Sequence, residues 1–295
     1  MDLNVDSFLQ YLQKERKYSL NTVQAYENDL TEFSEFCEKR FGKDVLNIGV
    51  SDVREWVVEM SDGLDAVGVR TVKRRISALR SFYKYLRREG LVNKNPAAVL
   101  VLPKASKPLP KFFREEEMGR LLDDVMTGDE FQDRRDKLII DLFYQTGVRV
   151  SELVEIKDRD IDMGRGMLRV FGKRRKERLI PIGGKLLKEI EAYKAKRNTE
   201  VGKTSDLFVR KNGEKMYRRG VYDVVHRSLT KVSSLKKRSP HVLRHTFAST
   251  MLNNGADIYA VKALLGHSSL AATEVYTHSS FAKLIKTYKT AHPRA

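Results

Sequence analysis

The sequence predicts a mainly α-helical chain with a small antiparallel β-sheet, organised as two domains. Apolar residues recur at helical spacing through the first hundred residues. A stretch containing Pro103, Pro108 and Pro110 then interrupts regular structure, because proline fixes φ and lacks a backbone donor. Farther along, two short β-prone runs flank a polar, basic connection, which is the pattern of a hairpin set among helices.

Residues 1–100 are expected to form a helical domain. One helix is predicted to begin at Ser19, a favourable N-cap residue, and to end before Gly42. Its buried face carries apolar residues at intervals of three or four positions: Val23, Tyr26, Leu30, Phe33 and Cys37. A second helix is predicted to begin near Ser51, and a third covers residues 70–88 and closes at Gly90.

Residues 101–111 are interpreted as an extended linker, and residues 112–295 as a second, mixed domain. The elements predicted in that domain are helices at 115–126 and 134–146, hairpin strands at 167–171 and 178–182, a candidate third strand at 207–209, and further helices from Val221 onward. One of these later helices is expected to start at an Asp257 cap and to end at Gly266.

The charge balance indicates a polyanionic partner. The 295 residues include 56 Lys and Arg against 39 Asp and Glu, a net charge of +17. Residues 1–68 sum to −7, residues 69–105 to +9 and the remainder to +15. Because the excess begins abruptly at Arg70, it favours a nucleic-acid-binding surface over a uniform solubility coat. With the single cysteine Cys37, no apolar membrane span and no secretory signal, the sequence predicts a reduced, cytoplasmic protein.

The helix over residues 70–88 places a row of cations beside its apolar face. Lys73, Arg80, Lys84 and Arg87 lie at i, i+7, i+11 and i+14. Such a row could bind the phosphates along a DNA backbone, or could place the helix in a major groove. The alternative is a solvated face of an amphipathic helix with no ligand. The candidate DNA-binding residues of the whole chain are Lys73, Arg74, Arg80, Lys84, Arg87, Arg174, Arg175, Lys176, Lys236, Lys237 and Arg238.

A second candidate site follows Ser239 and Pro240, which together start a helix. His241, Arg244 and His245 share one face of it at i, i+3 and i+4. Two histidines four residues apart are a zinc-binding spacing, but the guanidinium between them disfavours a cation. The helix N-terminus favours an anion, so we expect a phosphate ligand and no metal, with a purely structural helix as the alternative.

Five short motifs, taken in order, resemble the tyrosine recombinase (phage integrase) family: QTGVRVSEL at 145–153, GK at 172–173, HVLRH at 241–245, LLGHSS at 264–269 and VYTH at 275–278. The early segment SLNTVQAYENDLTEF and the final AHPRA are similar to the Xer site-specific recombinases in particular, so the resemblance covers nearly the whole chain. It implies a two-domain DNA clamp, in which a helical core-binding domain is joined to an α+β catalytic domain.

The resemblance also implies the active-site residues, which would be Arg149, Lys173, His241, Arg244, His267 and Tyr276. Tyr276 would attack a DNA phosphodiester to give a 3′-phosphotyrosyl link and a free 5′ hydroxyl, with His241 as its base. The two arginines would bind the phosphate oxygens in place of a metal ion, so no metal, ATP or other cofactor is expected. Glu152 either holds Arg149 or forms a plain surface pair with it.

One position departs from the family pattern. The hairpin usually carries GKGxKxR, whereas this chain has GKRRKER, so Arg174 replaces a glycine beside Lys173, the expected proton donor to the 5′ oxygen. The conformation of this loop is therefore left open by the sequence.

The implied partners are a double-stranded DNA recombination site and a homo- or hetero-tetramer with a related recombinase on paired sites. A C-terminal helix at 280–290, with Phe281, Leu284, Ile285 and Tyr288 on one face, is expected to dock on a neighbouring protomer or on its own domain. The expected role is resolution of chromosome or plasmid dimers in the nucleoid, with a division-associated DNA translocase as regulator. A mobile-element integrase and a non-catalytic DNA-binding protein are the alternatives.

Overall fold

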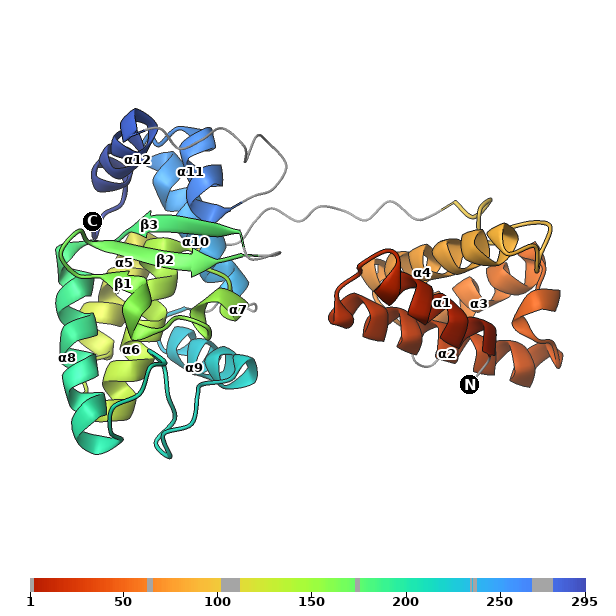
Figure 1. The fold of residues 1–295 in the computed structure, drawn as a ribbon, viewed down its shortest axis with the longest axis horizontal. Helices are drawn as coiled ribbons and strands as arrows, with labels where there is room; N and C mark the ends of the chain where they lie inside the picture. The colour runs from red at the N-terminus through yellow and green to blue at the C-terminus, as the bar shows by residue number, and fades with distance from the viewer. Residues whose placement is uncertain are drawn as a thin grey trace. The chain divides into compact units, whose positions relative to one another are not determined.

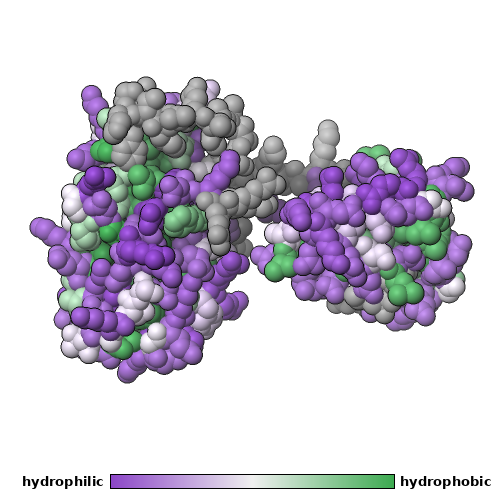
Figure 2. Space-filling view, in the orientation of Figure 1, coloured by the Kyte–Doolittle hydropathy of each residue, from purple (hydrophilic) through white to green (hydrophobic). Residues whose placement is uncertain are grey.

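The computed structural model describes residues 3–62, 66–101, 112–172, 176–233, 235, 238–266 and 278–295. The chain forms two compact units, Met1–Pro108 and Leu109–Ala295, and each encloses a hydrophobic core of its own. Hydrophilic side chains cover most of the visible face of each unit (Figure 2). The domain boundaries predicted at residues 100 and 112 stay predictions, because residues 102–111 lie outside the described part of the chain.

Every regular element in the described part of the first unit is a helix (Figure 1). Its elements are α1 (Leu3–Lys14), α2 (Leu20–Phe41), the 3₁₀ turn η1 (Val45–Asn47), α3 (Val50–Asp62) and α4 (Val69–Arg88). Ser19 caps α2 by accepting a hydrogen bond from the backbone N–H of Thr22, and Gly42 ends the helix in the left-handed conformation, as the sequence predicted. Phe33 and Trp56 pack edge to face in the centre of this core, with ring centroids 4.8 Å apart.

The second unit contains helices around a small sheet. Its elements are α5 (Glu115–Gly119), the π-helical turn η2 (Arg120–Val125), α6 (Phe131–Thr146), α7 (Val150–Leu153), the 3₁₀ turn η3 (Asp158–Asp160), β1 (Ile161–Asp162), β2 (Met167–Phe171), β3 (Glu177–Pro181), α8 (Gly184–Glu200), α9 (Arg218–Thr230), α10 (Pro240–Asn253), α11 (Ile258–Leu265) and α12 (His278–Ala291). The predicted fold class, mainly helical with a small antiparallel sheet, is confirmed.

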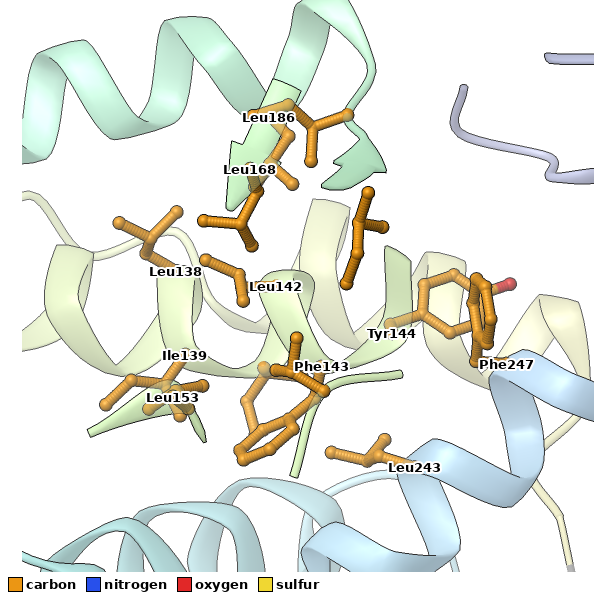
Figure 3. Packing of buried hydrophobic residues seen from close by; sticks show 14 of the residues in the cluster. Leu138, Ile139, Leu142, Phe143, Tyr144, Leu153, Leu168, Leu186, Leu243 and Phe247 are labelled. Atoms are coloured by element: carbon orange, nitrogen blue, oxygen red, sulfur yellow. The ribbon is translucent and has the colours of Figure 1, made fainter. Parts of the chain in front are cut away.

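Helix α6 forms the centre of this unit. Every residue from Leu138 to Thr146 is buried, and the helix contacts α8, α9 and α10. Figure 3 shows Phe143 and Tyr144 of α6 close to Leu243 and Phe247 of α10, with side chains of the sheet and α8 on another side of the helix. A helix buried on all sides in this way fixes the elements around it, and its C-terminal end leads directly into the candidate site.

The sheet has the order β1-β2-β3, with both pairings antiparallel. The predicted third strand at 207–209 is wrong. All three of its residues are buried, but the segment forms only isolated bridges, between Asp206 and Lys157 and between Val209 and Lys215, and no continuous ladder. The strand that completes the sheet beside the hairpin is β1, which is too short, at two residues, for a sequence pattern to predict.

Two other elements differ from the sequence analysis. Helix α8 was not predicted, although Leu186, Ile190 and Tyr193 form its buried face at helical spacing. Ser239 precedes α10 with Pro240 at the first turn, as predicted, but its side chain makes no capping hydrogen bond. Its Oγ is buried and finds no partner among the described residues.

Helix α12 docks on its own unit. Leu284, Tyr288 and Ala291 belong to the core of the second unit, which agrees with the own-domain alternative, and docking on a neighbouring protomer stays a prediction. A helix of this length needs tertiary contacts, and the core supplies them. No described helix is long and apolar enough to cross a membrane.

Candidate active site and nucleic-acid interface

Arg149 lies at the N-cap of α7, directly after the turn that ends α6. Its backbone N–H donates to Oε2 of Glu152 (2.8 Å), and its Nη1 donates to Oε1 of the same carboxylate (2.8 Å). The Glu152 side chain is only 2% exposed, whereas that of Arg149 is 37% exposed. The prediction that Glu152 holds Arg149 is therefore confirmed, and the plain surface pair is wrong.

A second arginine, which the sequence analysis did not assign to the site, binds the same carboxylate. Arg178 of β3 donates through Nη1 and Nη2 to the two oxygens of Glu152, each at 2.9 Å. Its Nε donates to the carbonyl oxygen of Leu264 at 2.6 Å. The sequence carried a signal for this residue, because strand alternation puts Arg178 on the same buried face as Ile180, where a charge needs a partner.

The third arginine, Arg244 of α10, is buried and donates to two backbone carbonyls. Its Nη1 bonds the oxygen of Gly147 at 2.5 Å, and its Nη2 bonds that of Leu265 at 2.6 Å. Gly147 has a φ of +59°, and a Cβ there would lie 2.6 Å from the Phe247 ring. Only glycine fits this turn, which brings the backbone close enough to accept from Arg244.

All three arginines donate hydrogen bonds to backbone carbonyls at the end of α11. The carbonyls of Leu264, Leu265 and Gly266 are consecutive and accept hydrogen bonds from Arg178, Arg244 and Arg149 respectively, the last at 3.3 Å. Carbonyls at a helix C-terminus lack intrahelical partners and carry partial negative charge, so they attract guanidinium groups. We name Arg149, Arg178, Arg244 and Glu152 the arginine cluster.

Electrostatics make this cluster a site for an anion. Three guanidinium groups and one carboxylate leave a charge of +2 in a largely buried space. Burial, and then the charges of Arg149 and Arg178, lower the pKa of Arg244 to about 9, so it is still protonated at neutral pH. Burial alone would raise the pKa of Glu152, but the hydrogen bonds from Arg178 and then those from Arg149 hold it below its usual value.

The remaining predicted catalytic residues are placed only in part. His241 and His245 are exposed on α10, whereas Arg244 points inward, so the three do not share one environment. Lys173, His267 and Tyr276 lie outside the described residues. Two glycines that precede them in the chain are described: a Cβ on Gly172 would lie 3.8 Å from Glu152, and one on Gly266 would lie 3.0 Å from Arg178.

The predicted cationic row of α4 is divided by its contacts. Within the row, Arg80 donates to the carbonyls of Ala97 and Leu100. Arg74, a candidate outside the row, forms an ion pair with the buried Asp29. Lys84 and Arg87 are exposed and have no hydrogen-bond or ion-pair partner within the described residues. Together with Arg80, Asn95 and Ala98, they line a pocket of about 410 Å³.

Four further DNA-binding candidates, Arg174, Arg175, Lys236 and Lys237, lie outside the described residues. Lys176 is exposed at the base of the hairpin, where its carbonyl accepts from the N–H of Gly172 at 2.7 Å. Arg238 donates to the carbonyl of Ser233 at 3.1 Å. In the described part of the chain, no three His, Cys, Asp or Glu side chains form a group that could hold a metal ion.

Comparison with known proteins agrees with this geometry. The family model described as the phage integrase family matches residues 111–283, and the phage integrase N-terminal SAM-like domain matches residues 5–90. This chain belongs to the phage integrase family. The predicted membership of the tyrosine recombinases is thereby confirmed, and the chain is a site-specific tyrosine recombinase, an enzyme that transfers DNA strands.

Two family members are similar to this chain over nearly their whole length. Tyrosine recombinase XerC of Listeria monocytogenes is 40% identical over 292 residues, which covers 98% of this chain and 97% of the relative. Tyrosine recombinase XerC of Oceanobacillus iheyensis is 37% identical over 302 residues, with 100% and 97% covered.

Solved recombinases share the fold. The XerH site-specific recombinase bound to its difH substrate is 20% identical, with a TM-score of 0.69 over 97% of this chain and 82% of that one. The Tn1549 transposon integrase in complex with circular intermediate DNA is 18% identical, with a TM-score of 0.72 over 95% and 98%.

Proposed function

We propose that this tyrosine recombinase cuts and rejoins double-stranded DNA with Tyr276 as nucleophile and with Arg149 and Arg244 holding the scissile phosphate, and that it resolves chromosome or plasmid dimers. The observation that carries the proposal is the arginine cluster, whose charge of +2 lies at the junction of α7, β3, α10 and α11. A phosphodiester carries one negative charge, and the transition state of its cleavage carries about two, so the cluster stabilises the transition state more than the substrate.

The proposed reaction exchanges one ester for another. The phenolic oxygen of Tyr276 forms a bond to phosphorus as the bond from phosphorus to the 5′ oxygen breaks. His241 takes the phenolic proton, Lys173 protonates the departing 5′ oxygen, and His267 donates a hydrogen bond to the phosphate. The phosphorus has exchanged its bond to the 5′ oxygen for a bond to the tyrosine oxygen, so it is still a diester. A 5′ hydroxyl can therefore attack it and reverse the reaction without ATP.

Binding would use both units. The exposed Lys84 and Arg87 of α4 offer cations to the DNA backbone, as do the hairpin and the segment before α10. The XerH structure bound to difH and a λ integrase dimer bound to a core site share this fold, which supports a duplex partner and an assembly of several protomers. We extend this to a tetramer on paired sites, to a nucleoid location and to regulation by a division-associated DNA translocase.

Covalent capture tests the proposal. In a nicked suicide duplex, the short fragment that carries the new 5′ hydroxyl dissociates after cleavage, so a protein–DNA adduct should accumulate, even in the presence of EDTA. Tyr276→Phe should bind the same duplex without forming this adduct. An undiminished adduct from Tyr276→Phe, or cleavage that requires a divalent ion, would refute the mechanism. The full-length similarity to XerC proteins favours dimer resolution, and adducts confined to the ends of a mobile element would favour the integrase alternative.

A further inference from the structure

The proposed chemistry assigns roles to two guanidinium groups of the arginine cluster and leaves Arg178 without one. The Arg178 side chain is 7% exposed, and each of its three nitrogens donates inside the protein, two to Glu152 and one to the Leu264 carbonyl. Arg149 is far more exposed, at 37%. A phosphate therefore reaches Arg149 from solvent, and Arg178 lies behind it.

We propose that Arg178 is a positioning residue for DNA cleavage: it holds the Glu152 carboxylate and the end of α11 in place, so that Arg149 keeps its charge available for the scissile phosphate. This inference rests on the proposed role of Arg149. It assigns Arg178 no contact with DNA, and it predicts that its loss slows the cleavage step without weakening DNA binding.

The charge balance supports this role. With Arg178 present, two guanidinium groups share one carboxylate, and the cluster retains +2. Without it, Glu152 is buried with Arg149 as its cationic partner, and the cluster retains +1. Arg149 would then be drawn toward a second bond with the carboxylate, because a buried charge needs full pairing. The phosphate would lose both charge and a correctly directed donor.

The position of Arg178 links the segments that lead to the other proposed catalytic residues. It lies on β3, which the hairpin joins to β2, and the hairpin base at Gly172 approaches Glu152. Its guanidinium also packs under Gly266, where a Cβ would lie 3.0 Å from Nη1. One side chain thus connects α7, β3 and the end of α11, which precedes His267 in the sequence.

Arg178→Lys is the central test. Lysine keeps the charge, but its donors all lie on one nitrogen, so it cannot reproduce the planar fork whose three separate nitrogens bond the two Glu152 oxygens and the Leu264 carbonyl. Cleavage is measured as single-turnover adduct formation on a suicide duplex at saturating protein, and affinity is measured separately with an intact duplex. We expect the cleavage rate to fall about 10- to 100-fold, as for other residues that orient a reacting group, and the Kd for DNA to change less than about twofold.

Arg197 provides a matched control. Its side chain is 1% exposed, and it makes two hydrogen bonds to Asp158, at 3.0 and 2.8 Å, and donates to the carbonyls of Asp206 and Leu207. It therefore has the same chemistry as Arg178, but it contacts no member of the arginine cluster. Arg197→Lys should lower the melting temperature and leave the cleavage rate per folded molecule unchanged.

A double-mutant cycle tests whether Arg178 acts through Glu152. Arg178→Met with Glu152→Gln removes both charges, avoids a buried unpaired carboxylate and supplies a second variant should Arg178→Lys fold poorly. If the two residues act as a unit, the double variant cleaves no more slowly than the slower single variant. Fully additive losses, a wild-type rate for Arg178→Lys, or an equal loss in Arg197→Lys would overturn the inference. Absence of any adduct from the wild-type protein would overturn the proposed function itself.

Discussion

Acidification should weaken the docking of the C-terminal helix through one buried imidazole. His292 is 4% exposed and lies among the rings of Tyr144, Phe247 and Tyr288. Its Nε2 is 3.1 Å from the carbonyl of Tyr144, and its Nδ1 accepts from the backbone N–H of Arg294 at 3.2 Å. The neutral ring satisfies both contacts, whereas a protonated Nδ1 would face another donor.

The magnitude follows from the pKa of this group. Burial, opposed by the contact with the Tyr144 carbonyl, lowers the pKa of His292 from 6.5 to about 4. The unfolded chain therefore binds more protons between these values, so the stability of the neutral form is complete above pH 6.5 and is lost as the pH falls toward 4. Linkage gives a loss of about 2 kcal/mol at pH 5 and about 3 kcal/mol at pH 4.

Hydrogen exchange of the α12 amides, measured by mass spectrometry from pH 8 to pH 4 after correction for intrinsic rates, gives the free energy of opening of this helix. Carboxylates elsewhere in the protein also contribute to acid sensitivity. The quantity to compare is therefore the difference in the free energy of opening between the wild type and His292→Gln. The single tryptophan, Trp56, lies in the core of the first unit, and its fluorescence in urea reports a transition that this substitution should not alter.

We expect the wild type to lose about 2 kcal/mol more than His292→Gln between pH 8 and pH 5. The matched control is His226→Asn, since His226 is exposed on α9, and it should follow the wild type at every pH. An equal acid sensitivity in wild type and His292→Gln would refute the reasoning, because the penalty would then belong to other groups.

Three further outcomes are expected. Gly147→Ala should destabilise the second unit by more than about 2 kcal/mol and slow cleavage, as measured by calorimetry and adduct formation, because a Cβ there overlaps Phe247 and the φ is positive; Gly90→Ala, with positive φ but open space, should cost only about 1 kcal/mol. Lys84→Gln should weaken binding to duplexes of different sequence by the same factor. It should also reduce the slope of the log binding constant against log salt concentration by about 1, whereas Glu35→Gln should not reduce this slope. Arg244→Lys should abolish most adduct formation in a gel assay, because lysine has no planar fork of separate nitrogens to bond the Gly147 and Leu265 carbonyls and direct a donor at the phosphate. Retention of wild-type cleavage would show that Arg244 does not hold the phosphate.

Sequence patterns predicted the helices of this chain where local chemistry decides the structure. Ser19 with Gly42, and Asp257 with Gly266, bound helices because cap residues act within a few positions of the backbone groups they satisfy. The strand β1 was missed because its two residues are paired by tertiary context and not by any propensity of their own.

The candidate site was predictable in part. Arg149 and Arg244 were assigned through ordered motifs, and spacing alone suggested that Glu152 holds Arg149. For Arg178 the sequence predicts only a strand, and the one signal of its role is its core-facing position, where a charge needs a partner. The contacts at the end of α11 could not be predicted, because they join residues far apart in the chain. Arg244 is 21 residues from its acceptor, Arg178 is 86 and Arg149 is 117.

The three acceptors at the end of α11 have a consequence for the enzyme between reaction cycles. Three like charges crowded together would push one another apart whenever the nucleic acid dissociates. Here each guanidinium retains a backbone oxygen to bond, so the vacated pocket keeps its arrangement without an anion. The resting protein therefore meets its next strand with little rearrangement left to perform, because its donors are already in place before the phosphate arrives.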